Sequence, residues 1–332
     1  MPHAATSSHA PQHPSSGPLS SAPLPTPLTG VVPPLCTPLT ADGEVDVAGL
    51  KGLVGRLTDA GAAGLFVLGS SGEAAFLDDA RRAAVLRAAV EAAEGRVPVL
   101  AGVIDMTPAR VIAHAERAAE AGASALVATA PFYTRTHPVE IAEHFRRIRA
   151  AVPLPLFAYD IPVAVHTKLP ASVVLELAED GTLTGLKDSS GDDGALRRLL
   201  VALRGRGLLE RFAVLTGSEL AVDGALLAGV HGVVPGLGNV DPEGYVRLYE
   251  FARDGRWAEA AAEQDRLAAL FALTDVGPEA LMGRNSSAIG AFKAALHLLG
   301  VIDCPATAAP QVPLDSEAVK TVRHLLEEAG LL

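Results

Sequence analysis

The chain has 332 residues, of which 49% are apolar and 20% are charged, and its formal net charge is -11. This length suits one large domain or two ordinary ones, and the apolar share is enough for a sizeable core. The negative charge argues against nucleic acid and against an anionic membrane surface as partners. Two cysteines, Cys36 and Cys304, exclude a disulfide scaffold and a thiolate zinc site. No uninterrupted apolar stretch approaches the roughly 18 residues that a membrane helix needs.

Residues 1–28 differ in composition from the rest of the chain. The segment from Met1 to Gly30 contains no Asp, Glu, Lys or Arg and is dominated by Pro, Ser, Ala and His. Such a segment buries too little apolar surface to offset its ordering entropy, so we expect a disordered tail over 1–28. It lacks the basic start and apolar middle of a secretory signal, which favours a cytoplasmic protein. His3, His9 and His13 could bind a metal weakly, although a floppy tail is the simpler interpretation.

From Val31 onward, short β-branched or Leu-rich runs alternate with amphipathic segments. Eight such units over about 225 residues predict a (β/α)8 barrel over 29–255. A doubly wound sheet is the alternative, but it normally has a glycine-rich turn after its first strand, and none follows Cys36. The predicted strands are Val31–Cys36, Gly64–Gly69, Val97–Val103, Ala125–Ala130, Leu156–Tyr159, Leu183–Asp188, Phe212–Gly217 and Gly232–Pro235. The predicted helices lie near 46–61, 78–94, 107–122, 137–150, 169–179, 192–205, 218–228 and 241–254.

Residues 256–332 show helical periodicity without strand-like runs. The periodic segments are Trp257–Leu273, Ser286–Leu299 and Ser316–Gly330, and prolines separate the last two. We therefore predict a C-terminal helical region that packs on the barrel.

One lysine lies in an unusual place. Lys187 falls within a predicted strand, near its C-terminal end, which is where barrels of this kind carry their active sites. Burial disfavours an ammonium ion, and a neutral amine can attack a keto group to form a Schiff base. The alternative is a lysine that pairs with a neighbouring carboxylate such as Asp188. The four other lysines lie in predicted helices or a polar loop, where lysine is an ordinary surface residue: Lys51, Lys168, Lys293 and Lys320.

Two more strand ends carry polar groups that could act with Lys187. Tyr159 ends the preceding strand, and neighbouring strands lie about 4.8 Å apart, so its phenol could exchange protons with an adduct on Lys187. It could also be a packing residue at the barrel mouth. The turn at 69–73 offers two hydroxyls and free N–H groups that can hold a small carboxylate, although a plain turn uses the same residue types. No histidine or cysteine spacing outside the tail indicates a metal, so no metal site is expected.

Four motifs at these strand ends follow one another in a defined order. They are Gly69-Ser70-Ser71-Gly72-Glu73, Pro131-Phe132-Tyr133, Tyr159-Asp160-Ile161-Pro162 and Gly185-Leu186-Lys187-Asp188-Ser189-Ser190-Gly191. Together they resemble the dihydrodipicolinate synthase/N-acetylneuraminate lyase family of pyruvate-dependent class I aldolases. The resemblance spans residues 30–332 and leaves out only the tail.

The resemblance implies a role for each motif in proton transfer. Lys187 would form the Schiff base, and Tyr159 would donate and accept protons. Ser70 would relay protons between Tyr159 and Tyr133. In the synthase branch that last tyrosine comes from a neighbouring subunit, which implies a homo-oligomer, either a dimer or a tetramer.

The resemblance also implies how substrates bind. Ser70 and Ser71 would hold the pyruvate carboxylate, while Gly217 and Val234 match positions that line the pyruvate pocket. Ala164 occupies the place of an arginine that binds the acceptor's carboxylate in the synthase branch. No cofactor is implied beyond the covalent imine with pyruvate.

The sequence therefore predicts a lyase that condenses pyruvate with an aldehyde or cleaves a 4-hydroxy-2-oxo acid. Two alternatives remain open at this point. One is a sugar-acid aldolase or dehydratase of the same family, and the other is a non-catalytic relative that binds keto acids. The partners in each case are small molecules.

Overall fold

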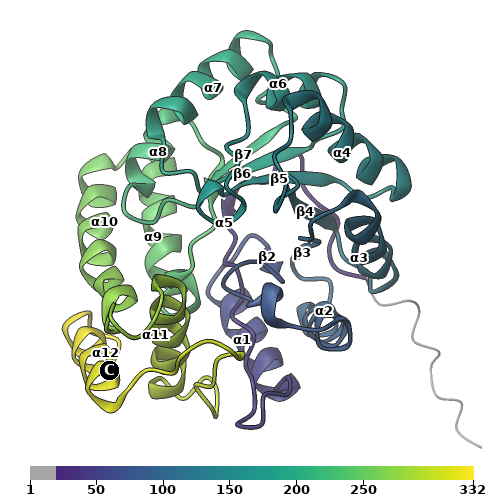
Figure 1. Ribbon diagram of the computed structural model, residues 1–332. Coiled ribbons are helices and arrows are strands. Elements are labelled where there is room, and N and C mark those ends of the chain that lie inside the picture. Colours follow the sequence, from purple (N-terminus) through teal and green to yellow (C-terminus); the bar gives the residue numbers. More distant parts are fainter. Residues whose placement is uncertain (1–19) are drawn as a thin grey trace, which may run out of the picture.

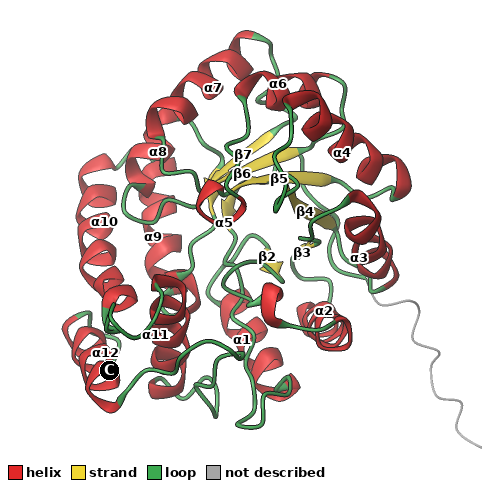
Figure 2. Ribbon diagram, viewed as in Figure 1, coloured by secondary structure: helices red, strands yellow, loops and turns green. Residues whose placement is uncertain are grey.

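The computed structural model describes residues 20–332, and the predictions for 1–19, including His3, His9 and His13, lie outside the described residues. Eight parallel strands form one sheet in the order β1-β8-β7-β6-β5-β4-β3-β2, with helices around it (Figures 1 and 2). This arrangement confirms the predicted barrel. The strands are β1 (Gly30–Val31), β2 (Leu65–Val67), β3 (Val99–Gly102), β4 (Ala125–Thr129), β5 (Leu156–Asp160), β6 (Gly185–Asp188), β7 (Ala213–Thr216) and β8 (Gly232–Val233).

The seam between β1 and β2 closes the sheet into a barrel. Pro34 and Phe66 form a parallel bridge. Phe66 N donates to Pro33 O at 3.0 Å, and Leu35 N donates to Phe66 O at 2.8 Å. The first strand is shorter than the predicted 31–36 because Pro33 and Pro34 have no backbone N–H to donate to a neighbouring strand.

Helices follow the strands and cover the outside of the barrel. Several begin at an aspartate that accepts a backbone N–H, as Asp78 does from Arg81 N at 2.8 Å and Asp192 from Ala195 N at 2.8 Å. The short helix α5 (Pro162–Val165) was not predicted, because four residues are too few to show a helical period. The other barrel helices are α1 (Val47–Asp59), α2 (Asp79–Ala93), α3 (Pro108–Glu120), α4 (Pro138–Ala151), α6 (Ala171–Glu179), α7 (Asp193–Gly205), α8 (Val222–Ala228) and α9 (Pro242–Arg253).

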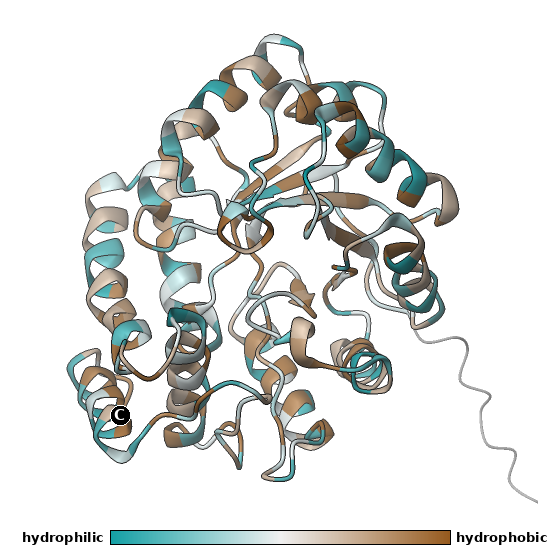
Figure 3. Cartoon of the chain, viewed as in Figure 1, coloured by the Kyte–Doolittle hydropathy of each residue, from teal (hydrophilic) through white to brown (hydrophobic). Residues whose placement is uncertain are grey.

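The barrel has two separate hydrophobic cores. Along β5, Phe157 and Tyr159 belong to the cluster inside the barrel, whereas Leu156 and Ala158 belong to the cluster between the sheet and the helices. This alternation follows from the two-residue period of a strand. In Figure 3 the central strands are mostly brown or pale, and the hydrophilic teal residues lie largely on the surrounding helices.

Residues 20–28 correct part of the predicted tail, because they pack against the barrel. Ser21 Oγ donates to Gly122 O at 2.8 Å, and Ala22 N donates to Val97 O at 3.3 Å. Leu28 is 1% exposed and belongs to the inner core. The lack of charged residues in this segment suggested disorder, but Leu24 and Leu28 pack against the core inside the barrel.

The C-terminal region contains the predicted helices as α10 (Trp257–Phe271), α11 (Arg284–Leu298) and α12 (Ser316–Glu328). Figure 1 shows the yellow connection between α11 and α12 running back towards the barrel before α12 begins. None of the helices within residues 20–332 has the length and apolarity required to cross a membrane.

Candidate active site

Lys187 and Tyr159 lie side by side at the C-terminal ends of β6 and β5. The two residues are direct partners in the strand register, and both side chains face the barrel interior. Lys187 Nζ lies 3.9 Å from the centroid of the Tyr159 ring and 5.1 Å from that of the Phe66 ring. Lys187 is 6% exposed and Tyr159 is 3% exposed. The amine is therefore buried and lies against two aromatic rings.

The alternative in which Lys187 pairs with Asp188 is wrong. Successive residues of a strand point to opposite faces, so Asp188 faces away from the barrel interior. There Lys168 Nζ lies 3.6 Å from Asp188 Oδ2 and forms a closer ion pair with Asp160 Oδ2. The carboxylate beside Lys187 in sequence is thus used by a different lysine.

Ser70 is the third predicted residue that the fold brings to this place. Its Oγ lies 3.4 Å from the hydroxyl of Tyr159. Burial alone would raise the pKa of Tyr159, but the charge of Lys187 and hydrogen bonds from Ser70, Lys187 and Ser189 lower it below its usual 10.0. These contacts make it easier for the Tyr159 hydroxyl to release a proton. A tyrosine that served only for packing would not need them.

The loop that carries Ser70 and Ser71 approaches neighbouring backbone closely. A Cβ at Gly72 would lie 3.1 Å from both Leu35 O and Leu68 N, so this position has no room for a side chain. Thr37 Oγ1 donates to Gly72 O at 2.8 Å. The close approach at Gly72 holds the loop against the backbone of Leu35 and Leu68, just beyond the end of β2.

Gly217 and Val234 directly follow the C-terminal ends of β7 and β8. Gly217 N donates to Asp188 O at 2.6 Å, and a Cβ at Gly217 would lie 2.0 Å from Ser189 Oγ. Val234 is 4% exposed and packs in the same inner core as Tyr159. That both residues line a pyruvate pocket stays a prediction.

Tyr133 is the one predicted catalytic residue that lies apart. It is 91% exposed and has a φ of 75°. Within residues 20–332 the hydrogen bond of Ser70 Oγ leads to Tyr159, and none joins it to Tyr133. A single chain thus brings together Lys187, Tyr159 and Ser70 and turns Tyr133 outward.

Comparison with known proteins gives the family. The family model described as Dihydrodipicolinate synthetase family matches residues 27–329. The chain belongs to this family. An uncharacterized DapA-like lyase of Halobacterium salinarum is 34% identical over 324 residues, which cover 98% of this chain and 99% of that protein. As a member of the family, the chain is a class I, pyruvate-dependent Schiff-base lyase.

Solved structures of this dihydrodipicolinate synthetase family share the fold. The dihydrodipicolinate synthase of Bacteroides thetaiotaomicron has a TM-score of 0.85 and 31% identity, over 92% of this chain and 99% of that one. YagE from Escherichia coli K12, solved in complex with pyruvate, has a TM-score of 0.84 and 29% identity, again over 92% and 99% of the two chains.

A cavity of about 670 Å³ opens beside the site of this family member. It is larger than pyruvate needs, which leaves room for a second substrate. Ala164 lines it, so the place of the synthase arginine faces the cavity. Other lining residues include Ser70, Thr129, Phe132, Tyr159, Ile161 and Arg110.

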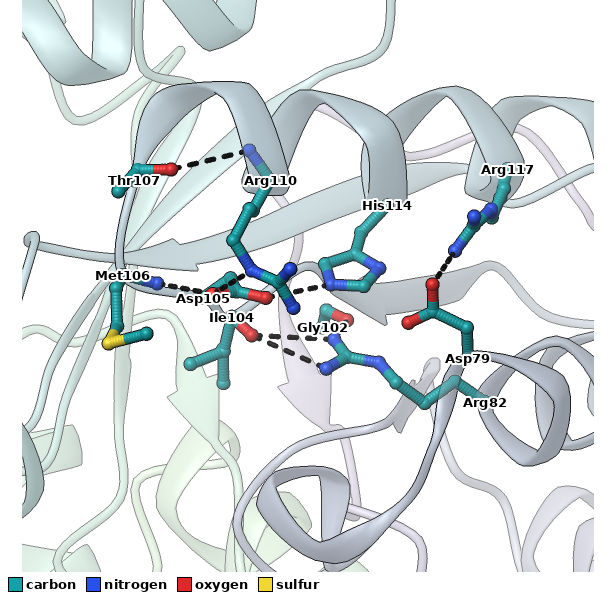
Figure 4. A network of polar contacts seen from close by, with 10 residues as sticks. All are labelled: Asp79, Arg82, Gly102, Ile104, Asp105, Met106, Thr107, Arg110, His114 and Arg117. Carbon is teal, nitrogen blue, oxygen red and sulfur yellow. Dashed lines mark hydrogen bonds and ion pairs between the residues drawn. The ribbon is translucent and has the colours of Figure 1, made fainter.

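A polar network that the sequence analysis missed forms the far wall of this cavity (Figure 4). Arg110 Nε donates to Asp105 Oδ1 at 2.8 Å, and His114 Nε2 lies 3.1 Å from Asp105 Oδ2. Burial alone would raise the pKa of Asp105, but the hydrogen bonds from Arg110, Met106 N and His114 lower it to about 2. Arg82 donates to backbone oxygens of β3 and the loop after it at 3.4–3.5 Å. These residues come from two different helices and a loop, and no sequence spacing links them.

Glu219 is a second residue without a role in the sequence analysis. It follows β7, and its Oε1 accepts from Leu237 N at 2.7 Å and from Tyr245 Oη at 3.2 Å. Burial raises the pKa of Glu219 to about 7. Among the described residues, no three His, Cys, Asp or Glu side chains are grouped so that they could hold a metal ion.

Proposed function

We propose that this chain joins or cleaves a pyruvate unit through an imine on Lys187. The observation that carries the proposal is the position of Lys187 Nζ, 3.9 Å from the ring centroid of Tyr159 and buried inside the C-terminal end of the barrel. Asp188, the carboxylate next to Lys187 in sequence, pairs with Lys168 instead, so this amine is left to bond to a keto carbon. The YagE relative bound to pyruvate supports the choice of keto acid.

The reaction needs only the groups of the chain and its two substrates. The Lys187 amine adds to the keto carbon of pyruvate, and loss of water gives the imine. Protonation of the imine nitrogen and loss of a proton from the methyl group give an enamine, whose carbon attacks the aldehyde while the aldehyde oxygen takes up a proton. Water then hydrolyses the new imine and returns the free amine. The same steps in reverse cleave a 4-hydroxy-2-oxo acid.

Tyr159 is the proton donor and acceptor in this proposal. Its hydroxyl lies beside Lys187, and its lowered pKa favours the exchange of protons with the adduct. Ser70, 3.4 Å away, would pass protons onward. Tyr133 would complete the relay from a neighbouring subunit, because its own side chain is exposed. The homo-oligomer that this requires stays a prediction, as does the cytoplasmic location.

Substrate binding follows from the loop and the cavity. The hydroxyls of Ser70 and Ser71 would hold the pyruvate carboxylate, with Gly217 and Val234 lining the pocket. The aldehyde would occupy the adjoining cavity of about 670 Å³. No cation stands at Ala164, so we infer a neutral or sugar-derived aldehyde. The same relative YagE, 29% identical over 304 residues, is named as a candidate 2-dehydro-3-deoxy-D-gluconate aldolase, which supports this class.

Borohydride reduction tests the proposal, because it converts an imine into a stable amine. Purified protein treated with pyruvate and borohydride should carry a three-carbon adduct on the peptide that contains Lys187, detected by mass spectrometry. Activity without an adduct on that peptide would contradict the Schiff base. An adduct without turnover of any aldehyde would favour a non-catalytic keto-acid-binding protein.

A further inference from the structure

Lys293, on α11, is a second buried lysine. Its side chain and that of Glu73 are both 0% exposed, and Nζ forms an ion pair with Glu73 Oε2. Nζ also donates to Ala306 O at 2.7 Å. The expectation that Lys293 would be an ordinary surface lysine is therefore wrong. The helix is buried on all sides over residues 289–296, so it has no solvent-facing stripe there.

The other oxygen of Glu73 is held by the same region of the chain. Glu73 Oε1 accepts from Ala308 N at 2.7 Å and from Gln311 Nε2 at 2.6 Å. Both donors lie in the connection between α11 and α12. The carboxylate of Glu73 is thus gripped entirely by residues 293–311, although Glu73 itself ends the loop that carries Ser70 and Ser71.

That loop has an unfavourable backbone conformation at both ends. Leu68 has a φ of 58° and Glu73 a φ of 57°, which is the left-handed region that residues with a side chain rarely adopt. Such conformations persist only when surrounding contacts hold them. Within the loop, Glu73 N donates to Ser70 O at 3.1 Å, so a hydrogen bond links the backbone of Glu73 to that of Ser70.

A buried ion pair contributes little net stability to a fold, because removing two charges from water costs about as much free energy as their attraction returns. An apolar pair of similar volume is often as stable or more so, whereas an ion pair fixes the relative position of two segments. Here the two segments are the C-terminal region and the loop beside Tyr159. The Ser70 Oγ–Tyr159 Oη distance of 3.4 Å is already long for a hydrogen bond, so a small shift of the loop would break it.

We propose that Glu73 and Lys293 are positioning residues, through which the C-terminal region holds the serines at 70 and 71 in place to bind the substrate carboxylate. The proposal rests on the proposed function and deepens it. Neither residue touches the substrate. Their effect passes through the backbone of residues 70–73.

The test measures the pyruvate concentration that gives half-maximal borohydride trapping, together with the thermal unfolding midpoint. The double variant Glu73→Gln/Lys293→Met removes both charges and keeps the shapes. Gln311→Leu removes one hydrogen bond to Glu73 and leaves the ion pair intact, so it should fold even if the double variant does not. Lys320→Met is the matched control, because Lys320 pairs with Glu317 on the exposed face of α12, with side-chain exposures of 71% and 77%.

We expect the half-maximal concentration to rise by roughly tenfold or more in the double variant, equivalent to a loss of about 1.4 kcal/mol or more in binding. For Gln311→Leu we expect about threefold or more, as for the loss of one hydrogen bond. The control should match the unaltered protein. Variants that lower the unfolding midpoint but trap at the unaltered concentration would show a purely structural pair and overturn the proposal. Failure of the unaltered protein to trap would instead overturn the proposed function itself.

Discussion

The two faces of β5 and β6 hold lysines in opposite circumstances. On the inner face, Lys187 lies against the rings of Tyr159 and Phe66. On the outer face, one residue further along each strand, Asp160 and Asp188 share the ammonium group of Lys168. Lys168 is engaged by two carboxylates, whereas Lys187 lies against two rings and can bond to a keto carbon. The direction of the side chain, rather than its place in the sequence, decides between these chemistries.

Removal of each lysine gives the largest contrast. Lys187→Met should abolish borohydride trapping and lower kcat by roughly 10³-fold or more, because the nucleophile is lost. Lys168→Met should trap normally and lose only stability. Trapping and turnover rates of both variants measure the difference. Normal trapping in Lys187→Met would transfer the imine to another lysine.

Tyr159→Phe tests whether the ring beside Lys187 acts only by packing. The variant keeps the ring and removes the hydroxyl, so we expect kcat to fall by about 10²–10⁴-fold, the usual contribution of a general acid–base group. Tyr249→Phe, on the outer helix α9, is the control and should leave kcat unchanged. A fall in kcat of less than about fivefold would make Tyr159 a packing residue.

The next prediction concerns which aldehyde the cavity beside Tyr159 accepts. A carboxylate placed at Ala164 lacks a charge-assisted hydrogen bond of about 1.5–3 kcal/mol. We therefore expect kcat/KM for aspartate semialdehyde to be lower than for a neutral or sugar-derived aldehyde by roughly tenfold or more. Ala164→Arg should narrow this gap. Equal values in the unaltered protein would assign the carboxylate to another cation of the cavity, such as Arg110.

Glu219 is a buried carboxyl group whose hydrogen-bond donors, Leu237 N and the Tyr245 hydroxyl, are neutral, unlike the carboxylates that pair with Lys168. Burial raises its pKa from 4.5 to about 7, so the folded chain binds a proton that the unfolded chain has released. Between pH 4.5 and about 7 the free energy of unfolding should therefore fall as pH rises, by up to about 3 kcal/mol. Urea unfolding across this range measures the slope. Glu219→Gln should flatten it, and an equally steep slope in the variant would attribute it to other groups.

The smallest effect is expected on the outer face. Asp160→Asn removes the closer partner of Lys168 but keeps an oxygen for Leu169 N, which donates at 3.1 Å. Because Lys168 is partly exposed and can be hydrated, we expect the free energy of unfolding to fall by only about 1 kcal/mol. Trapping on Lys187 should be unchanged. Impaired trapping would show that the Lys168–Asp160 ion pair also affects the position of Lys187 on the inner face of the strands.

The sequence predicts the barrel and its strand-end residues because both depend on local order. Strand periodicity places Lys187 and Tyr159 at neighbouring strand ends, and the structure pairs them in register. The Glu73–Lys293 pair could not be predicted in this way, since 220 residues separate its members and α11 lacks a polar stripe. Packing of residues 20–28 was missed for a related reason. Composition indicates how much apolar surface a segment has, but not which part of the folded protein that segment packs against.

The seam between β1 and β2 has a consequence for measuring motion in the site. Phe66 donates and accepts the hydrogen bonds that join the two strands, and its ring is one of the two that face Lys187. On the β1 side, Pro33 and Pro34 carry no amide proton. Deuterium uptake at the amides of Leu35 and Phe66 would therefore report directly on how often the barrel opens along this joint. Each opening would also loosen one wall around the amine.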